Sequence, residues 1–120
     1  MARSLYELQV FRKSLDRCAA ALKPYGLDLI EIVMNGTAKT LEHCTSSFVA
    51  IIAMQVALTD TLASLGIKPD FFVGHSLGEL GCGYADDTLT AEQAVLAAYW
   101  RGQAFLESDV AHFAMAAIGE

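Results

Sequence analysis

The stretch from residue 71 to residue 80 limits the possible folds of this chain more than any other. A short apolar run after Pro69-Asp70 is typical of a buried strand, and an Ala/Gly-rich segment that can be helical follows the turn. Between them lies Gly74-His75-Ser76-Leu77-Gly78, a Gly-x-Ser-x-Gly pentapeptide. Strand, glycine-flanked serine and helix in this order predict a nucleophile elbow, a sharp turn that exposes a strained serine above the edge of a sheet.

Each position of the pentapeptide has an expected task. Gly74 and Gly78 are expected to give clearance at a turn too sharp for side chains two residues from the serine. Ser76 is the candidate nucleophile, and the N–H of Leu77 is expected to point to where an oxyanion would form. Neighbouring side chains diverge at a turn, so we expect His75 to pack, hydrogen-bond or contact substrate rather than act as the base. A serine that sits in a tight turn by chance is the alternative.

Composition restricts the class of function. The chain has 120 residues, of which 54% are hydrophobic and 18% are charged; this predicts elements buried on both faces, or part of a larger core. A net charge of −6 argues against nucleic acid and anionic membranes as partners. Three scattered cysteines form no disulfide or zinc pattern, and the first residues lack the pattern of a signal peptide. We therefore expect free thiols, no bound metal and a cytoplasmic location.

Hydrophobic periodicity predicts helices before the elbow. Apolar residues at three- and four-residue steps predict an amphipathic helix over residues 5–22, which Pro24 and Gly26 end. Asp28 is a candidate cap for a short helix over residues 29–34.

The rest of the chain continues this pattern around the elbow. Residues 37–43 are interpreted as a polar connection, and residues 48–65 as a long helix that is apolar nearly all round and hence buried. Its most apolar run is too short to cross a bilayer. After the elbow a helix is expected to reach about residue 85, and the capping box Thr90-x-x-Gln93 predicts another helix over residues 91–107.

The order of these elements predicts the fold class. Helix, short loop, buried strand, tight turn and helix is the rhythm of an α/β fold with a parallel sheet flanked by helices. Residues 113–118 are typical of the opening of another strand, and the chain ends inside it. Because the run before the elbow is the one other predicted strand, we expect a fragment that is truncated at both ends.

The residues from 74 to 79 resemble the nucleophile motif of the acyltransferase (malonyl transferase) family of fatty-acid and polyketide synthases. Cys82-Gly83-Tyr84-Ala85-Asp86 and Tyr99-Trp100-Arg101-Gly102-Gln103 make the chain similar to the malonyl/acetyl transferase domain of an animal-type multifunctional fatty acid synthase. The resemblance covers essentially all 120 residues. It implies part of an α/β-hydrolase-like large subdomain over residues 1–111 and the start of a ferredoxin-like small subdomain over residues 112–120.

The resemblance also implies a chemistry. Ser76 would attack the thioester of malonyl-CoA or acetyl-CoA, and the acyl group would pass to the phosphopantetheine thiol of an acyl carrier protein. Leu77 would supply a backbone oxyanion donor, and Arg101 would pair with the malonyl carboxylate, which suits a planar guanidinium. No cofactor is expected to be bound. The implied partners are the carrier protein, a ketosynthase and other synthase domains, in a homodimeric parent.

Some parts of the family pattern are expected outside this sequence. The resemblance implies a catalytic histidine beyond Glu120 and a second oxyanion element before Met1. His112 falls too soon after the elbow to suit a general base, and His43 is expected in a surface loop. Phe113 replaces a residue that is usually small in the family.

Three other functions stay open at this stage. The first is a polyketide synthase acyltransferase. The second is an α/β-hydrolase esterase or thioesterase, which shares the elbow and in which Arg101 would be an ordinary solvated cation. The third is a partial scaffold, because we expect these 120 residues alone to be inactive and poorly folded.

Overall fold

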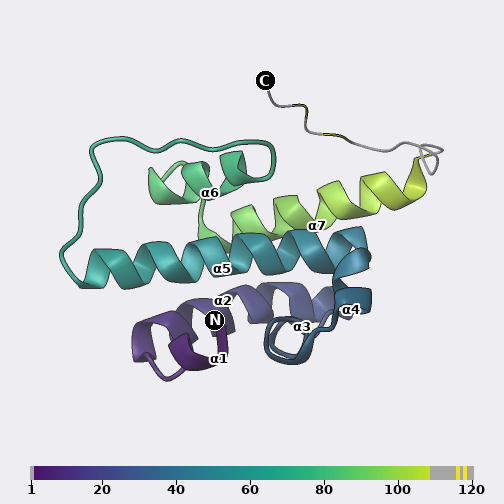
Figure 1. Ribbon diagram of the computed structural model, residues 1–120, viewed down its shortest axis with the longest axis horizontal. Helices are drawn as coiled ribbons and strands as arrows, with labels where there is room; N and C mark the ends of the chain where they lie inside the picture. The colour runs from purple at the N-terminus through teal and green to yellow at the C-terminus, as the bar shows by residue number, and fades with distance from the viewer. Residues whose placement is uncertain (1, 109–115, 117, 119–120) are drawn as a thin grey trace.

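The computed structural model describes residues 2–108, 116 and 118, and the regular structure in these residues is helical. Figure 1 shows α5 across the middle of the molecule, with α2 on one side of it and α6 on the other, and α7 beside it. The elements, in chain order, are α1 (Ala2–Leu5), α2 (Gln9–Leu22), the 3-10 helix η1 (Lys23–Tyr25), α3 (Leu29–Asn35), α4 (Ala38–Glu42), α5 (Cys44–Ser64), α6 (Gly78–Ala85) and α7 (Ala91–Glu107).

Helix α5 forms the centre of the core, as its apolar sequence predicts. By length and composition alone it could also cross a membrane, the one such helix among the residues described, and a core helix passes the same test. Here it contacts α2, α6 and α7. Its buried residues are Thr45, Ser46, Val49, Ala50, Ile52, Ala53, Val56 and Ala57.

Helix α2 packs one apolar face against this core. Phe11, Leu15, Cys18 and Leu22 recur at steps of three and four residues and are fully buried, which confirms the predicted amphipathic pattern. The helix predicted over residues 5–22 is broken, because α1 ends at residue 5 and α2 begins at residue 9.

The chain leaves α2 through a tight turn. Pro24 lies within η1, and Gly26 follows it with a φ of 75°. This left-handed conformation is easily adopted by a residue without a Cβ atom. The predicted end of the helix at Pro24 and Gly26 is therefore confirmed.

Local capping bonds define the smaller helices. The side chain of Asp28 accepts a hydrogen bond from the Glu31 N–H at 3.0 Å, as predicted for α3. The polar connection predicted over residues 37–43 is wrong, because it contains α4. Thr37 and Thr40 cap that helix reciprocally, an arrangement that hydrophobic periodicity does not reveal.

Helix α7 begins at the predicted capping box. The Gln93 N–H donates to the Thr90 hydroxyl, and the Gln93 side chain accepts from the Thr90 N–H. Near its other end α7 approaches α5 closely, because a Cβ atom at Gly102 would lie 2.6 Å from the Cα atom of Thr45. This contact fixes the position of the last turns of α7, which carry Arg101.

The segment before the elbow differs from its prediction. Residues 71–73, expected as a buried strand, belong to a connection without regular structure that runs back from the end of α5 to α6 (Figure 1). Phe71 and Val73 are 87% and 95% exposed. A strand requires a neighbour for its backbone hydrogen bonds, and the described residues provide none. The α/β class therefore stays a prediction.

The second predicted domain lies almost wholly outside the described residues. Within residues 112–120, only Ala116 and Ile118 are described, and both are exposed without regular structure. His112 and Phe113 are outside the described residues, so the predicted strand over 113–118 and the small subdomain stay predictions.

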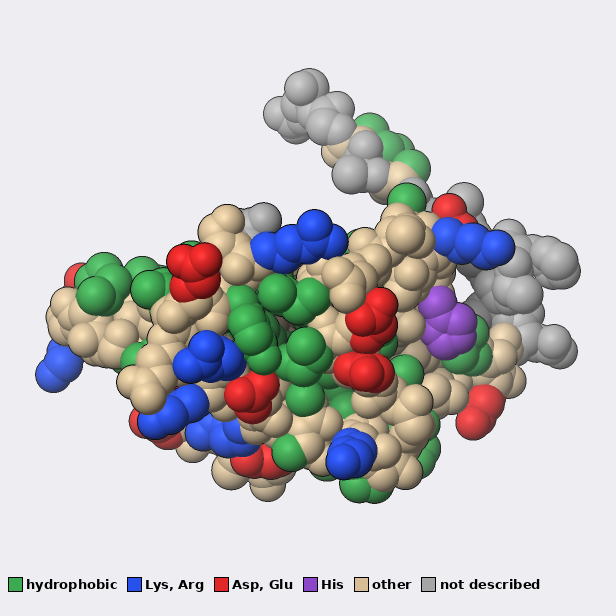
Figure 2. Space-filling view, turned by 90° about the horizontal axis from the view of Figure 1, so that it is seen from below, with side chains coloured by type: hydrophobic (Ala, Val, Ile, Leu, Met, Phe, Trp, Pro, Cys, Tyr) green, Lys and Arg blue, Asp and Glu red, His purple; other side chains and the backbone are tan. Residues whose placement is uncertain are grey.

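The surface carries charges of both signs. Figure 2 shows one face of the molecule, on which Lys and Arg side chains alternate with Asp and Glu around an apolar area. This face presents no continuous basic surface of the kind that nucleic acid would need.

Candidate functional site

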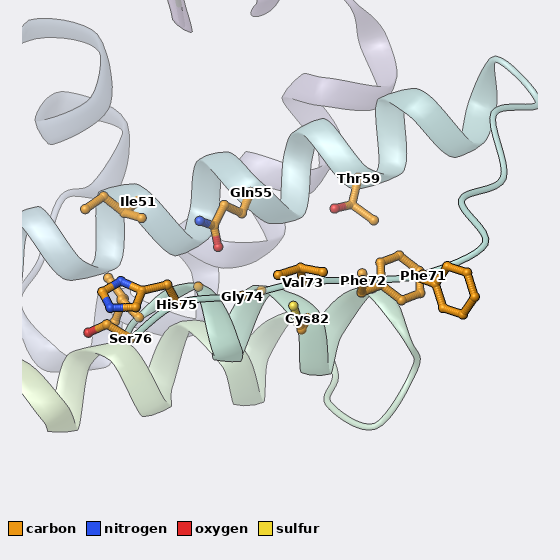
Figure 3. A pocket seen from close by; sticks show the side chains of 14 residues that line it. Ile51, Gln55, Thr59, Phe71, Phe72, Val73, Gly74, His75, Ser76 and Cys82 are labelled. Atoms are coloured by element: carbon orange, nitrogen blue, oxygen red, sulfur yellow. The ribbon is translucent and has the colours of Figure 1, made fainter. Parts of the chain in front are cut away.

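The elbow lies beside a cavity of about 590 Å³ between α5 and α6. One wall comes from α5, the second from the segment 71–78, and the third from α6 (Figure 3). The residues that line the cavity are Ile51, Gln55, Thr59, Phe71, Phe72, Val73, Gly74, His75, Ser76, Leu77, Gly78, Gly81, Cys82 and Ala85.

Ser76 has the backbone conformation expected of an elbow serine. Its φ is 55°, and Asp87 is the one other described non-glycine residue with a positive φ. A side chain in this left-handed region is strained, and such strain often accompanies a functional site. The Gly78 N–H donates to the His75 carbonyl at 2.9 Å and the Glu79 N–H to the Ser76 carbonyl at 3.2 Å. These bonds fold the turn directly into α6.

The two glycines of the pentapeptide have different surroundings. A Cβ atom at Gly74 would lie 2.6 Å from the Gly78 carbonyl oxygen and 2.8 Å from Cys82 Sγ. Position 74 therefore has no room for a side chain. A Cβ atom at Gly78 would meet nothing within 4 Å. The clearance expected of Gly78 is not needed against the part of the chain that the structure describes.

Leu77 joins the elbow to the core. It immediately precedes α6, and its side chain is buried in the hydrophobic cluster. Among the described residues its N–H has no hydrogen-bond partner. A free N–H at the start of a helix is suited to bind developing negative charge.

Arg101 is brought to Ser76 by the packing of α6 against α7. Its Nη2 atom donates a hydrogen bond to Ser76 Oγ at 3.2 Å, across 25 positions of sequence. Both residues are exposed. A guanidinium has five N–H donors, so donors remain for an anionic group bound beside the serine.

The histidines do not complete a serine–base pair among the described residues. His75 lines the cavity, and no hydrogen bond joins its side chain to Ser76. His43 is exposed at the N-terminus of α5. His112 lies outside the described residues.

A polar network that the sequence analysis missed holds α6 in place. Asp60 of α5 accepts hydrogen bonds from Ser14, from Arg17 at 3.3 Å and from the Tyr84 hydroxyl at 2.5 Å. Arg17 also donates to the Tyr84 hydroxyl at 2.7 Å. Burial, with the bond to Asp60, raises the pKa of Tyr84 to about 12. One signal in the sequence was available: Asp60 is an acidic residue in an otherwise uncharged helix.

The buried thiol near this network has no role in the chemistry. Burial raises the pKa of Cys18 to about 12. A thiol with so high a pKa is protonated at neutral pH and is a poor nucleophile.

Sequence comparison agrees with this geometry. The family model of the acyl transferase domain matches residues 1–120. The chain is 36% identical over 116 residues to the highly reducing polyketide synthase srdA of Neurospora crassa, and the aligned region covers 92% of this chain and 5% of that protein. It is 35% identical over 104 residues to the highly reducing polyketide synthase alnA of Emericella nidulans, covering 85% and 4%. It is 39% identical over 108 residues to the hybrid PKS-NRPS synthetase pynA of Aspergillus niger, covering 85% and 3%.

The chain belongs to the acyl transferase domain family. It spans about one twentieth of the length of these relatives or less. The expected animal type of fatty acid synthase is not supported, because these relatives are fungal polyketide synthases. They fit the alternative of a polyketide synthase acyltransferase better.

Proposed function

We propose that this chain is part of an acyltransferase in a polyketide-type multidomain synthase, with Ser76 as the nucleophile and Arg101 as the residue that binds the acyl group. The observation that carries the proposal is the contact of Arg101 with Ser76 Oγ at 3.2 Å, on a turn where Ser76 has a φ of 55°. The family match and the polyketide synthase relatives support it.

The proposed reaction has two halves. Ser76 Oγ attacks the carbonyl carbon of an acyl-CoA thioester, the C–S bond breaks, and the serine proton passes to the sulfur, so CoA leaves as the thiol. The phosphopantetheine thiol of an acyl carrier protein then attacks the acyl-serine ester and returns the proton to Ser76. In both halves the N–H of Leu77, at the start of α6, stabilises the oxyanion.

Arg101 supplies the proposed substrate preference. A malonyl group has a free carboxylate that one methylene separates from the thioester carbonyl, and a guanidinium binds a carboxylate through two parallel N–H donors. Because Arg101 already touches the serine oxygen, an acyl group on Ser76 would lie within reach of its other donors. An acetyl group has no charge for Arg101 to bind. We therefore propose malonyl-CoA as the preferred donor.

Two features bear on the alternatives. The tract Tyr99-Trp100-Arg101-Gly102-Gln103 keeps a fatty acid synthase as the second candidate, with the same reaction and the same residues. An esterase or thioesterase would use water as the acceptor. The cation beside Ser76 favours transfer of a charged acyl group over hydrolysis of a neutral one.

Labelling of the serine tests the proposal. In the full synthase, Ser76→Ala should abolish the covalent label formed with radiolabelled malonyl-CoA, because the nucleophilic oxygen is removed. Ser64→Ala, at the exposed end of α5, is the matched control and should label as the wild type does. Wild-type labelling of Ser76→Ala would contradict the proposal.

A second measurement separates transfer from hydrolysis. The wild-type synthase is incubated with malonyl-CoA, with and without its carrier protein. Acyl transferase activity predicts malonyl-carrier protein and little free malonate. Rapid release of malonate that the carrier protein leaves unchanged would favour the hydrolase.

A further inference from the structure

Gln55 is an amide side chain in the middle of the most apolar helix. It lies on α5 among Met54, Val56 and Ala57, and it lines the cavity of the elbow opposite residues 74–77 (Figure 3). A carboxamide is poorly suited to an apolar helix unless it has hydrogen-bond partners. Its half-buried place at the edge of the core therefore requires a reason other than packing.

The side-chain oxygen of Gln55 is a hydrogen-bond acceptor without a donor. Oε1 is shielded from solvent and has no partner among the residues described. Buried acceptors in folded proteins are rarely left without a partner, and each exception calls for an explanation.

The structure makes room for this amide. A Cβ atom at Gly81, on α6, would lie 2.2 Å from Gln55 Oε1 and 3.1 Å from Cδ. A residue with a side chain at position 81 would thus displace the carboxamide from the cavity. The amide oxygen thus lies against α6, and Figure 3 shows the carboxamide directed from α5 towards the segment that carries Gly74.

The backbone opposite Gln55 also has free donors. In the described part of the chain, the N–H groups of Gly74 and His75 have no hydrogen-bond partner, while the His75 carbonyl accepts from Gly78. A carboxamide carries both an acceptor and two donors, and a single water can bridge two such groups. Gln55 and the peptide before Ser76 are therefore complementary.

We propose that Gln55 is a positioning residue for the nucleophile turn: its carboxamide holds the Gly74–His75 peptide through one bridging water and so fixes the strained backbone of Ser76. Gln55 acts through the turn and does not touch the acyl group. The inference rests on the proposed role of Ser76 as nucleophile.

The test uses the full synthase and the variant Gln55→Met, which keeps the length of the side chain and removes its hydrogen bonds. Gln103→Met is the matched control, because Gln103 makes a single bond of 3.4 Å to Thr45, between α5 and α7. The first readout is the rate at which a fluorophosphonate, a general serine reagent, modifies Ser76. The second is the kcat and KM of malonyl transfer.

A positioning role predicts a specific pattern. Gln55→Met should slow both reactions about tenfold, which corresponds to ~1.4 kcal/mol of barrier. The KM should change less than about twofold, because the acyl group does not contact Gln55. Gln55→Glu, which keeps an acceptor at the same place, should recover part of the rate, and Gln103→Met should react as the wild type does. Similar melting temperatures for the two Met variants would separate positioning from loss of stability.

Several results would overturn the inference. Equal rates for Gln55→Met and Gln103→Met would do so, as would a rise in KM alone. If Gln55→Met does not fold, Gln55→Asn decides: it keeps the amide but withdraws it by one methylene, so an unchanged rate would contradict positioning. The fluorophosphonate rates are independent of the substrate. Failure of malonyl labelling in the wild type would therefore contradict the proposed function alone.

Discussion

Arg101 and Ser76 are separated by 25 positions and meet through one hydrogen bond of 3.2 Å. At the scale of single residues, this contact distinguishes the site from a serine that merely sits in a tight turn. An arginine on an exposed helix is usually only solvated. Here the cation contacts the side-chain oxygen of a serine whose φ is 55°, so a strained backbone and a positive charge occur together at one residue.

The contact leads to a prediction about substrate preference. Arg101→Ala should lower kcat/KM for malonyl transfer roughly thirtyfold. This corresponds to a loss of about 2 kcal/mol of transition-state stabilisation, the usual contribution of a hydrogen bond to a charged group. Acetyl transfer should fall much less, because acetate lacks the second carboxylate. Rates with both CoA esters are measured in the full synthase.

Two further variants control for the charge itself. Arg101→Lys keeps the charge but loses the paired donors, so it should recover only part of the malonyl rate. Arg12→Ala removes an exposed cation of α2 and should leave both rates unchanged. Equal losses for malonyl and acetyl in Arg101→Ala would count against a carboxylate-binding role.

Among the helices, α6 is the element whose position matters most, because it begins at the elbow. It has eight residues and no fully buried side chain, so apolar burial of α6 itself contributes little. Tyr84 compensates by joining α6 to Asp60 on α5 and Arg17 on α2. The network thus fixes the far end of the helix that begins at Gly78, two residues after Ser76.

The Tyr84 bond makes stability sensitive to alkaline pH. The pKa of Tyr84 is raised to about 12 in the folded protein from an unfolded value of about 10. Above pH ~10 the unfolded chain releases this proton first, so the free energy of unfolding should fall as pH rises from ~10 to ~12. Below pH ~10 this contribution is complete and constant. Urea unfolding of wild type and Tyr84→Phe at several pH values measures the difference.

The test compares how steeply the free energy of unfolding falls with pH in each variant. Tyr84→Phe should be less stable than the wild type at neutral pH, and should lose less stability over the alkaline range. Tyr25→Phe, at an exposed ring that contacts Tyr99 and Trp100, is the control for the loss of a tyrosine hydroxyl at the surface. Parallel curves for wild type and Tyr84→Phe would show that Tyr84 does not titrate as proposed.

At the scale of the whole molecule, the segment before the elbow is unusual because its apolar side chains are exposed. Phe71 and Val73 are almost fully exposed, and apolar side chains of this size are usually buried. The chain also spans a small part of its relatives. We propose that residues 71–74 pair with strands of the larger protein, in the α/β arrangement that the sequence predicts.

Hydrogen exchange tests this arrangement. In the full synthase, the amides of residues 71–74 should exchange at least about a hundredfold more slowly than in a polypeptide of these 120 residues, because ladder hydrogen bonds protect them. The amides of α5, which lies in the core, are the internal control and should be protected in the full synthase. Fast exchange of residues 71–74 in the full synthase would contradict the sheet.

The sequence by itself determined most of the helices and the kind of turn at Ser76. Caps such as Asp28 and Thr90, the spacing of Phe11, Leu15 and Leu22, and the glycine at position 74 act over a few residues, so they can be read locally. The short helix α4 escaped this reading, because a threonine pair rather than an apolar face defines it.

The resemblance implied that Ser76 and Arg101 serve one site, and only the tertiary structure decided how closely distant groups approach. The contact of Arg101 with Ser76, the network around Asp60, and the unpartnered amide of Gln55 beside the elbow depend on how α2, α5, α6 and α7 pack. Spacing along the chain does not specify these distances, because packing between helices sets them. For the same reason the strand at residues 71–73 stays a prediction: its conformation depends on a neighbour that local sequence cannot supply.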